Sequence, residues 1–212
     1  MNQTLSTIFE GIIAGDGAAV QQNVKAALDE AQEPTVVLNE GMIAAMREVG
    51  RRFEEGDFFV PEMLLSARAM QAGMAVLKPS LQQSNVQSAG KVVIGTVKGD
   101  LHDIGKNLVA LMLEGAGFEI RDMGIDVAAE DFIDALRSED ADILALSALL
   151  TTTLPSMKQT IEAVKEAGLR ERVKILIGGA PVNDDYAKQI GADGYSPDAS
   201  RAVAVAESLM KK

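Results

Sequence analysis

The segment from Gly99 to Gly105 contains His102, the only histidine of the 212-residue chain, and Asp100 precedes it by two residues. At this spacing a carboxylate can accept a hydrogen bond from one ring nitrogen and leave the other free to bind a metal. Gly105 would let a bulky group approach the backbone. The same residues are also compatible with a plain hydrogen bond in a surface loop. A single histidine excludes any metal site built from several histidines.

Two further short signals stand at the ends of predicted strands. Ser147-Ala148-Leu149 closes one apolar run, and Gly178-Gly179 closes the next. A glycine pair permits close approach of a ligand to the backbone, although an ordinary turn also uses such pairs and a serine at a strand end often has no special role. Ligands of open parallel sheets bind at the carboxyl ends of the strands. Together the three signals predict one ligand site at that edge.

Strands and helices alternate in the second half of the chain. Short β-branched and apolar runs predict strands at 92–97, 118–123, 143–147, 173–177 and 193–195. Helical periodicity and breakers predict helices at 104–115, 128–138, 154–167, 184–190 and 197–210. Repeated strand–helix units favour a parallel sheet covered on both faces. We therefore predict a flavodoxin-like α/β domain with five parallel strands over residues 89–212.

The first half of the chain has helical periodicity throughout. Apolar residues recur at i, i+3/i+4 and i+7 in stripes over 5–12, 20–31, 42–53 and 63–77. Glycine, proline and aspartate separate the stripes, so four amphipathic helices with short loops favour a helical bundle over residues 1–88. The polar segment 79–90, rich in serine and glutamine, is interpreted as a linker.

The composition restricts the classes of function. A net charge of −11 argues against nucleic acid and anionic membrane as partners. The absence of cysteine excludes disulfides and thiolate metal ligands. No apolar run reaches the roughly 18 residues of a membrane span, and the N-terminus lacks the basic and apolar regions of a secretory signal. We therefore expect a cytoplasmic protein.

Taken together, Asp100-x-His102-x-x-Gly105, Ser147-x-Leu149 and Gly178-Gly179 resemble the signature of a cobalamin-binding module. That module occurs in cobalamin-dependent methionine synthase and in the small corrinoid proteins of methanol, methylamine and methoxyaromatic methyltransferase systems. The resemblance covers nearly the whole chain, and segments 97–107 and 56–62 are especially similar. The size and the two-domain plan look like a stand-alone corrinoid protein.

The resemblance implies roles for individual residues. His102 would be the lower axial ligand of cobalt, replacing the cofactor's own dimethylbenzimidazole in a His-on, base-off state, and Asp100 would hold its other ring nitrogen. Thr153 stands where methionine synthase has a serine, so it would extend this pair into a relay, or simply cap the following helix. The corrinoid and its nucleotide tail would lie against Gly99, Asp100, Leu101, His102, Asp103, Gly105, Ser147, Leu149, Thr151, Gly178, Gly179 and Ala199.

In the same family the helical bundle caps the upper face of the cobalt. Phe53, Val60 and Met63 match the cap positions, and Glu40 would reach the edge of the corrin ring. Phe53, Val60 and Met63 also suit an ordinary apolar core stripe, so both interpretations stay open.

The function that the resemblance implies is methyl transport. Co(I) would take a methyl group on a substrate-specific methyltransferase, and methyl-Co(III), as in methylcobalamin, would pass it to a second methyltransferase with a folate or thiol acceptor. A reductive activase would be a further partner. The chain would then be a non-catalytic carrier subunit, and methanol, methylamines, betaines and methoxyaromatics all remain open as methyl donors.

Three alternatives remain at this point. A cobalamin-dependent sensor would use a similar bundle and sheet domain, but it normally needs an output domain. The cobalamin-binding subunit of a mutase would use adenosylcobalamin and would not need a bundle over a methyl group. A flavodoxin-like signalling domain would bind no corrinoid at all.

Overall fold

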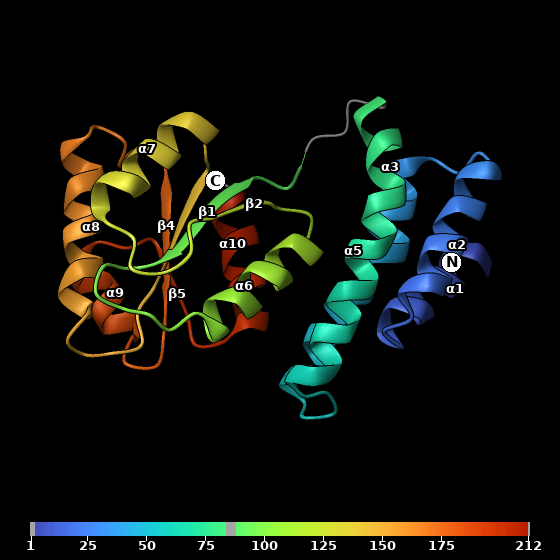
Figure 1. Cartoon of the computed structure of the whole chain (residues 1–212), viewed down its shortest axis with the longest axis horizontal. Helices are drawn as coiled ribbons and strands as arrows, with labels where there is room; N and C mark the ends of the chain where they lie inside the picture. Colours follow the sequence, from blue (N-terminus) through green and yellow to red (C-terminus); the bar gives the residue numbers. More distant parts are fainter. Residues whose placement is uncertain (1–2, 84–87, 212) are drawn as a thin grey trace. The chain divides into compact units, whose positions relative to one another are not determined.

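The computed structural model describes residues 3–83 and 88–211, and its internal contacts divide the chain into two compact units, residues 1–87 and 88–212. Figure 1 shows a helical first unit and an α/β second unit. Among the described residues, no helix combines the length and the apolar character needed to cross a membrane.

The first unit is built from helices that bury one apolar face each. They are α1 (Gln3–Ile13), α2 (Gly17–Asp29), α3 (Pro34–Val36), the π-helical segment η1 (Val37–Ile43), α4 (Ala44–Glu54) and α5 (Val60–Gln83). Because α3, η1 and α4 follow one another without a break, they form one continuous rod with a π-helical middle. The described part of this unit is therefore a bundle of four helical rods, as the periodicity predicts.

Close helix packing explains why small residues occur inside these helices. A Cβ on Gly73 of α5 would lie 2.7 Å from the Val20 side chain and 2.8 Å from that of Met42. The core of the unit is formed by side chains with almost no exposed surface: Leu5, Ile8, Ile12, Val20, Val24, Met42, Met46, Met63, Met70 and Leu77.

The predicted linker begins too early. Helix α5 continues through Pro79 to Gln83, where the linker interpretation expected an irregular chain. Leu77 and Leu81 are both buried and lie four residues apart on one helix face, so their burial favours continuing the helix. An internal proline removes one helical hydrogen bond, which this packing offsets. Residues 84–87 of the predicted linker lie outside the described residues.

The second unit is a sheet of five parallel strands in the order β2-β1-β3-β4-β5. The strands are β1 (Lys91–Thr96), β2 (Glu119–Asp122), β3 (Ile143–Ser147), β4 (Lys174–Gly178) and β5 (Gly194–Ser196). The helices are α6 (Ile104–Gly115), α7 (Ala129–Glu139), α8 (Leu154–Glu166), α9 (Asp184–Ile190) and α10 (Ala199–Met210). This strand order is the flavodoxin-like one, so the predicted fold class is confirmed.

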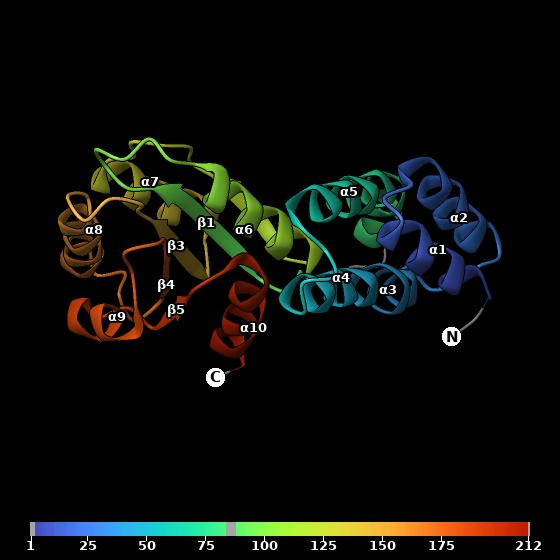
Figure 2. The ribbon, with the colours of Figure 1, turned by 90° about the horizontal axis from the view of Figure 1, so that it is seen from below.

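Helices cover both faces of this sheet, and each face has its own core. Figure 2 shows α7, α8 and α9 on one side of the strands and α6 and α10 on the other. Phe132 and Met157 are fully buried in the core of the first face, and Leu113 and Ala206 in that of the second. Burial on both faces accounts for the continuous apolar runs of β3 and β4.

The last helix begins two residues later than predicted. Asp198 takes the N-cap position of α10, where its side chain accepts a hydrogen bond from the backbone N–H of Arg201 at 2.8 Å. Aspartate is a favoured capping residue because its carboxylate accepts a backbone N–H that has no partner inside the helix. The helix therefore starts at Ala199 and not at Pro197.

Candidate functional site

The strand register places the three motifs predicted to bind a ligand at the same end of neighbouring strands. Thr96, at the end of β1, pairs with Ser147 of β3, and Ser147 pairs with Gly178 of β4. The strand order reverses between β1 and β3, because the connection after β1 leads to α6 on one face of the sheet and the connection after β3 leads to α8 on the other. A crevice at the carboxyl ends of such strands is the usual ligand site of this fold.

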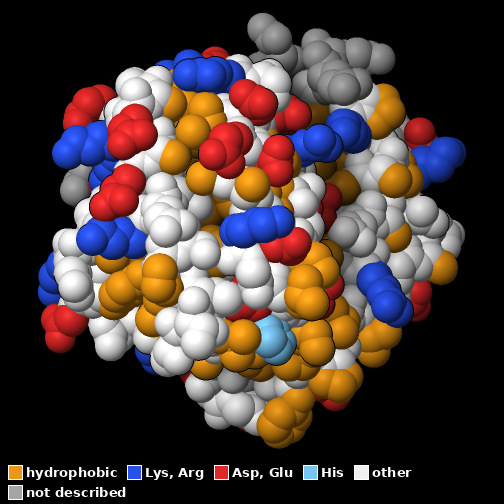
Figure 3. Space-filling view, turned by 60° about the vertical axis from the view of Figure 1, so that its left-hand side comes forward, with side chains coloured by type: hydrophobic (Ala, Val, Ile, Leu, Met, Phe, Trp, Pro, Cys, Tyr) orange, Lys and Arg blue, Asp and Glu red, His pale blue; other side chains and the backbone are white. Residues whose placement is uncertain are grey.

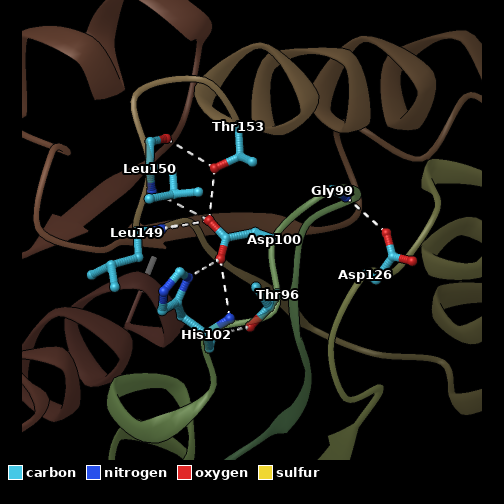
Figure 4. A network of polar contacts seen from close by, with 8 residues as sticks. All are labelled: Thr96, Gly99, Asp100, His102, Asp126, Leu149, Leu150 and Thr153. Atoms are coloured by element: carbon cyan, nitrogen blue, oxygen red, sulfur yellow. Dashed lines mark hydrogen bonds and ion pairs between the residues drawn. The ribbon is translucent and has the colours of Figure 1, made fainter.

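Asp100 is the centre of a hydrogen-bond network at this edge (Figure 4). It has no exposed surface. Its Oδ1 lies 2.7 Å from His102 Nδ1 and accepts the backbone N–H of His102 at 3.1 Å. Its Oδ2 accepts the Thr153 hydroxyl at 2.7 Å and the backbone N–H groups of Leu149 and Leu150 at 2.8 and 3.3 Å. The structure thus brings Asp100, His102, Leu149 and Thr153 together.

This network keeps Asp100 ionised. Burial by itself would raise the pKa of the carboxyl, but hydrogen bonds from Thr153, His102 and the Leu149 N–H outweigh it and hold the pKa of Asp100 well below its usual range. A carboxylate can only accept, so His102 Nδ1 carries the proton that it donates. The lone pair of the neutral ring then resides on Nε2, which is the atom available to a metal.

Asp100→Asn should destabilise the cofactor-free second unit in a pH-dependent way. A carboxyl with a lowered pKa in the folded state stabilises that state above its unfolded pKa of about 3.9, and this contribution is lost as the pH falls toward the folded value. We expect the variant to be less stable by about 1–3 kcal/mol at pH 7, because its amide NH₂ would face hydrogen-bond donors. The difference should shrink at about pH 3.

Urea unfolding followed by tyrosine fluorescence measures this effect in the correct unit, because both tyrosines of the chain, Tyr186 and Tyr195, lie in the sheet unit. Asp103→Asn is the matched control, since the Asp103 side chain accepts one hydrogen bond, from Asn107 at 3.1 Å. A pH-independent difference between wild type and Asp100→Asn would contradict the assignment of a buried carboxylate.

Thr153 contributes its hydroxyl to the network and does not cap α8. It occupies the N-cap position of α8 without a capping side-chain bond. Its hydroxyl lies 2.7 Å from Asp100 Oδ2 and 2.9 Å from the Leu150 carbonyl oxygen. One hydroxyl proton serves one of these acceptors at a time, so Thr153 has two alternative partners within reach.

Large apolar side chains stand exposed around the histidine. The His102 side chain is 50% exposed, and Leu101 and Ile104 next to it are 66% and 81% exposed. Leu149 and Leu150 are 43% exposed. Figure 3 shows hydrophobic side chains bordering the histidine. Such a patch indicates a binding surface, and exposed apolar side chains around one ring nitrogen suit a large, mainly apolar ring system.

The donor set fits a metal that arrives within such a ring. In residues 3–83 and 88–211, no group of three or more His, Cys, Asp or Glu side chains is arranged to hold a metal ion. A metal bound by His102 must therefore take its other ligands from elsewhere, and a macrocycle supplies them. Cobalt in a corrin ring meets this requirement.

Three glycines lie at the same edge of the sheet. Two of them, Gly105 and Gly178, have open space around them, whereas the conformation of the third, Gly179, requires a glycine. A Cβ on Gly105 would meet no atom within 4 Å, and one on Gly178 would meet only the Ser196 carbonyl oxygen at 3.4 Å. Gly179 differs, because it has a φ of +130° and its Cβ would lie 1.9 Å from the Ala148 carbonyl oxygen. A side chain added at Gly105 or at Gly178 would therefore start in open or nearly open space.

The other predicted contact residues are placed less uniformly. Gly99, with a φ of +85°, and the half-buried Asp103 lie in the His102 loop. Thr151 is exposed in the loop after β3, whereas Ala199 is buried in the first turn of α10. The hydrogen-bond donors to the Asp100 carboxylate in the described part of the chain are His102, Leu149, Leu150 and Thr153, and Gly99, Asp103, Thr151 and Ala199 are not among them.

The predicted cap residues lie in the helical unit. Val60 is 38% exposed, and Phe59 and Leu65 near it are 64% and 50% exposed. Phe53 is half-buried and Glu40 is exposed. Met63 is fully buried and packs as a core residue of its own unit.

Sequence reasoning missed several residues that shape the histidine loop. The Thr96 hydroxyl donates to the His102 carbonyl oxygen at 2.9 Å, and the Asp126 carboxylate accepts the Gly99 N–H at 2.8 Å. The buried Lys106 Nζ contacts both carboxylate oxygens of Asp122, at 2.6 and 2.5 Å. These partners are distant in sequence, and no local pattern marks them.

Comparison with known proteins finds matches for both units. A family model described as B12 binding domain matches residues 90–204, and a second of the same description matches residues 5–78. Dimethylamine corrinoid protein 1 of Methanosarcina acetivorans is 46% identical over 191 residues, covering 88% of this chain and 90% of that protein. A corrinoid protein of Desulfitobacterium hafniense is 38% identical and covers 98% of both chains.

Solved structures are similar over nearly the whole chain. A cobalamin-binding protein from Desulfitobacterium hafniense DCB-2 has a TM-score of 0.80 and 33% identity, covering 97% of this chain and 98% of the other. The methanol:cobalamin methyltransferase complex MtaBC from Methanosarcina barkeri contains a chain with a TM-score of 0.86 and 30% identity, with coverage of 99% and 80%. Both units thus match B12-binding domains, and the relatives of at least 38% identity that cover most of the chain are corrinoid proteins. The chain therefore belongs to the corrinoid proteins of methyltransferase systems.

Proposed function

We propose that this chain carries a methyl group on cobalt between a substrate-specific methyltransferase and a second methyltransferase, with His102 as the lower axial ligand in a His-on, base-off state. The observation that carries this proposal is the Asp100–His102 contact of 2.7 Å. It holds the proton on Nδ1 and leaves Nε2 free at a surface bordered by exposed leucine and isoleucine side chains.

The corrinoid, when bound, supplies a cobalt that accepts and gives up a methyl group, and the chain's own residues set the state of the axial imidazole. Asp100 accepts the hydrogen bond from Nδ1–H and so fixes the tautomer and the orientation of the ring, which leaves the Nε2 lone pair for the cobalt. The Thr153 hydroxyl, through its hydrogen bond to Asp100 Oδ2, holds the carboxylate in this position.

The space beside Gly105 and Gly178 would receive the displaced nucleotide tail of the cofactor. Ser147, Leu149, Thr151 and Gly179 would flank this tail on the β3 and β4 side. Ala199 is 5% exposed, so it would shape the slot from beneath.

The helical unit would shield the methyl group. Val60, with the exposed Phe59 and Leu65 near it, offers the apolar surface that such a cap requires. Phe53 would lie at its border and Glu40 at the corrin edge. Met63 would support this surface from the bundle core.

The names of the relatives suggest which methyl donor to test first. Dimethylamine corrinoid proteins from two Methanosarcina species are 46% identical to this chain. We therefore propose dimethylamine as the first donor to test and methanol as the second. A folate or thiol as final acceptor and a reductive activase complete the proposed system.

Reconstitution with hydroxocobalamin and methylcobalamin tests the proposed function. We expect a one-to-one complex whose cobalt(II) form shows nitrogen splitting in its electron paramagnetic resonance (EPR) spectrum. The methylated protein should lose its methyl group to a partner methyltransferase but not to buffer. A protein that binds no cobalamin would be a signalling domain, and one that binds only adenosylcobalamin would favour the mutase alternative. Stable binding of methylcobalamin without transfer would favour a sensor.

A further inference from the structure

The turn between β2 and α7 contacts the His102 loop at several points. Thr96 N–H donates to the Gly124 carbonyl oxygen at 3.0 Å, and Val97 forms a parallel bridge with Val127. Asp126 makes the contacts nearest to the network around Asp100. The turn therefore lies beside the loop that holds the histidine, as Figure 4 shows for Asp126.

Asp126 forms hydrogen bonds with the backbone of two consecutive residues, Gly99 and Asp100. Its carboxylate accepts the Gly99 N–H at 2.8 Å, and its own N–H donates to the Asp100 carbonyl oxygen at 3.0 Å. Two hydrogen bonds to adjacent residues fix the direction in which the Asp100 side chain leaves the backbone. That side chain in turn holds the His102 ring at 2.7 Å.

The backbone of Asp126 supports a specific role. Its φ is +55°, in the left-handed region that non-glycine residues seldom adopt. Such a conformation persists where the surrounding contacts hold it in place. The Gly99 N–H, and after it the Lys98 ammonium, lower the pKa of the Asp126 carboxyl. The residue is therefore a carboxylate in a constrained turn.

The neighbouring ion pair does not explain why an aspartate stands here. Lys98 Nζ lies 3.2 Å from Asp126 Oδ2, with the two side chains 61% and 42% exposed. Exposed pairs of this kind contribute little to stability. The hydrogen bond to Gly99 acts on the loop itself, so it is the contact with a consequence for the site.

We propose that Asp126 is a positioning residue for the axial histidine: through Gly99 and Asp100 it holds the His102 imidazole as the Nδ1–H tautomer with Nε2 aimed outward. The assignment of Nε2 as a cobalt ligand rests on the proposed function, whereas the effect on the imidazole does not. Asp126 acts through the loop, because its hydrogen bonds there are to the backbone of Gly99 and Asp100 and not to the ring.

The cofactor-free protein offers a direct test, because His102 is the only histidine of the chain. Labelling with ¹⁵N-histidine gives one imidazole, whose nitrogen shifts report the tautomer. We expect the Nδ1–H form in the wild type. Asp126→Gly keeps the left-handed turn without strain but removes the acceptor, so it should give a mixture of tautomers. Asp126→Asn retains an oxygen acceptor and tolerates this φ, so it should restore the wild-type shifts.

The cofactor-loaded protein gives an independent readout. In Asp126→Gly the equilibrium constant for imidazole coordination to cobalt(II), measured from the nitrogen splitting in EPR, should fall about ten-fold, at the low end of the range for groups that orient a metal ligand. Asp134→Ala, which removes an exposed carboxylate from α7, and Lys98→Ala, which removes the exposed ion pair, should both match the wild type.

Each outcome decides the inference. Wild-type tautomer and coordination in Asp126→Gly would overturn it, and so would an equal loss in Lys98→Ala, which would assign the effect to charge. If Asp126→Gly shows reduced folding by circular dichroism, Asp126→Ala takes its place, because it also lacks the acceptor and alanine adopts a similar φ at Ala31 in this chain; wild-type tautomer and coordination in that variant would overturn the inference. A wild type with the expected tautomer but no nitrogen splitting would refute the His-on proposal and leave the role of Asp126 in place.

Discussion

His102→Ala is expected to abolish the nitrogen splitting in the EPR spectrum of the cobalt(II) protein. The chain has no second histidine and no cysteine, so neither another imidazole nor a thiolate can take the vacated axial position. The cofactor should still bind through its tail, because the space beside Gly105 and Gly178 does not involve the imidazole. Methyl transfer to either partner should fall steeply, since the cobalt loses the ligand that tunes it.

Added imidazole provides the control for this variant. His102 is half-exposed, so its removal opens a space that a free imidazole molecule can enter from solvent, and the splitting should return in a saturable manner. His102→Gln keeps a side chain of similar length without an imidazole and should show no splitting. Nitrogen splitting that persists in His102→Ala without added imidazole would show that the axial ligand has another source.

The strands and helices of the sheet unit could be predicted to within one or two residues, because burial and hydrogen bonding follow a short-range pattern there. The limits of β3 at Ile143 and Ser147, and those of α9 at Asp184 and Ile190, coincide with the predicted ones. The predicted limits were wrong where a single contact determines where a helix begins or ends. The cap formed by Asp198 moves the start of α10, and the burial of Leu81 carries α5 past Pro79.

The candidate site was predictable only in part, for the same physical reason. Asp100 and His102 are close in sequence, so their hydrogen bond follows from local geometry, whereas Thr153 was found through the resemblance to a family. Asp126 reaches Gly99 across 27 residues, and its role depends on how the turn after β2 lies against the loop after β1. The spacing of apolar residues along the sequence does not reveal a contact between two loops.

A leucine in place of Gly105 or Gly178 is expected to weaken cobalamin binding strongly while leaving the fold intact. A side chain at Gly105 starts in open space, and Gly105 lies in the first turn of α6, where leucine is the better helix former. At Gly178 the nearest atom is the Ser196 carbonyl oxygen, and leucine is tolerated at the end of a strand. The added side chain would instead occupy the space assigned to the nucleotide tail.

Overpacking of a filled site typically costs about 1–3 kcal/mol, so the dissociation constant for cobalamin should rise roughly 10- to 100-fold, as measured by equilibrium dialysis. Circular dichroism and urea unfolding of the cofactor-free variants should match the wild type. Gln159→Leu adds the same side chain at an exposed position of α8 and should not change binding.

Gly179→Ala should behave differently and lower the stability of the cofactor-free protein, because its Cβ would collide with the Ala148 carbonyl oxygen. Gly178 and Gly179 thus differ, because the first has open space for a side chain and the second does not. Wild-type affinity in both Gly105→Leu and Gly178→Leu would place the tail elsewhere on the sheet unit.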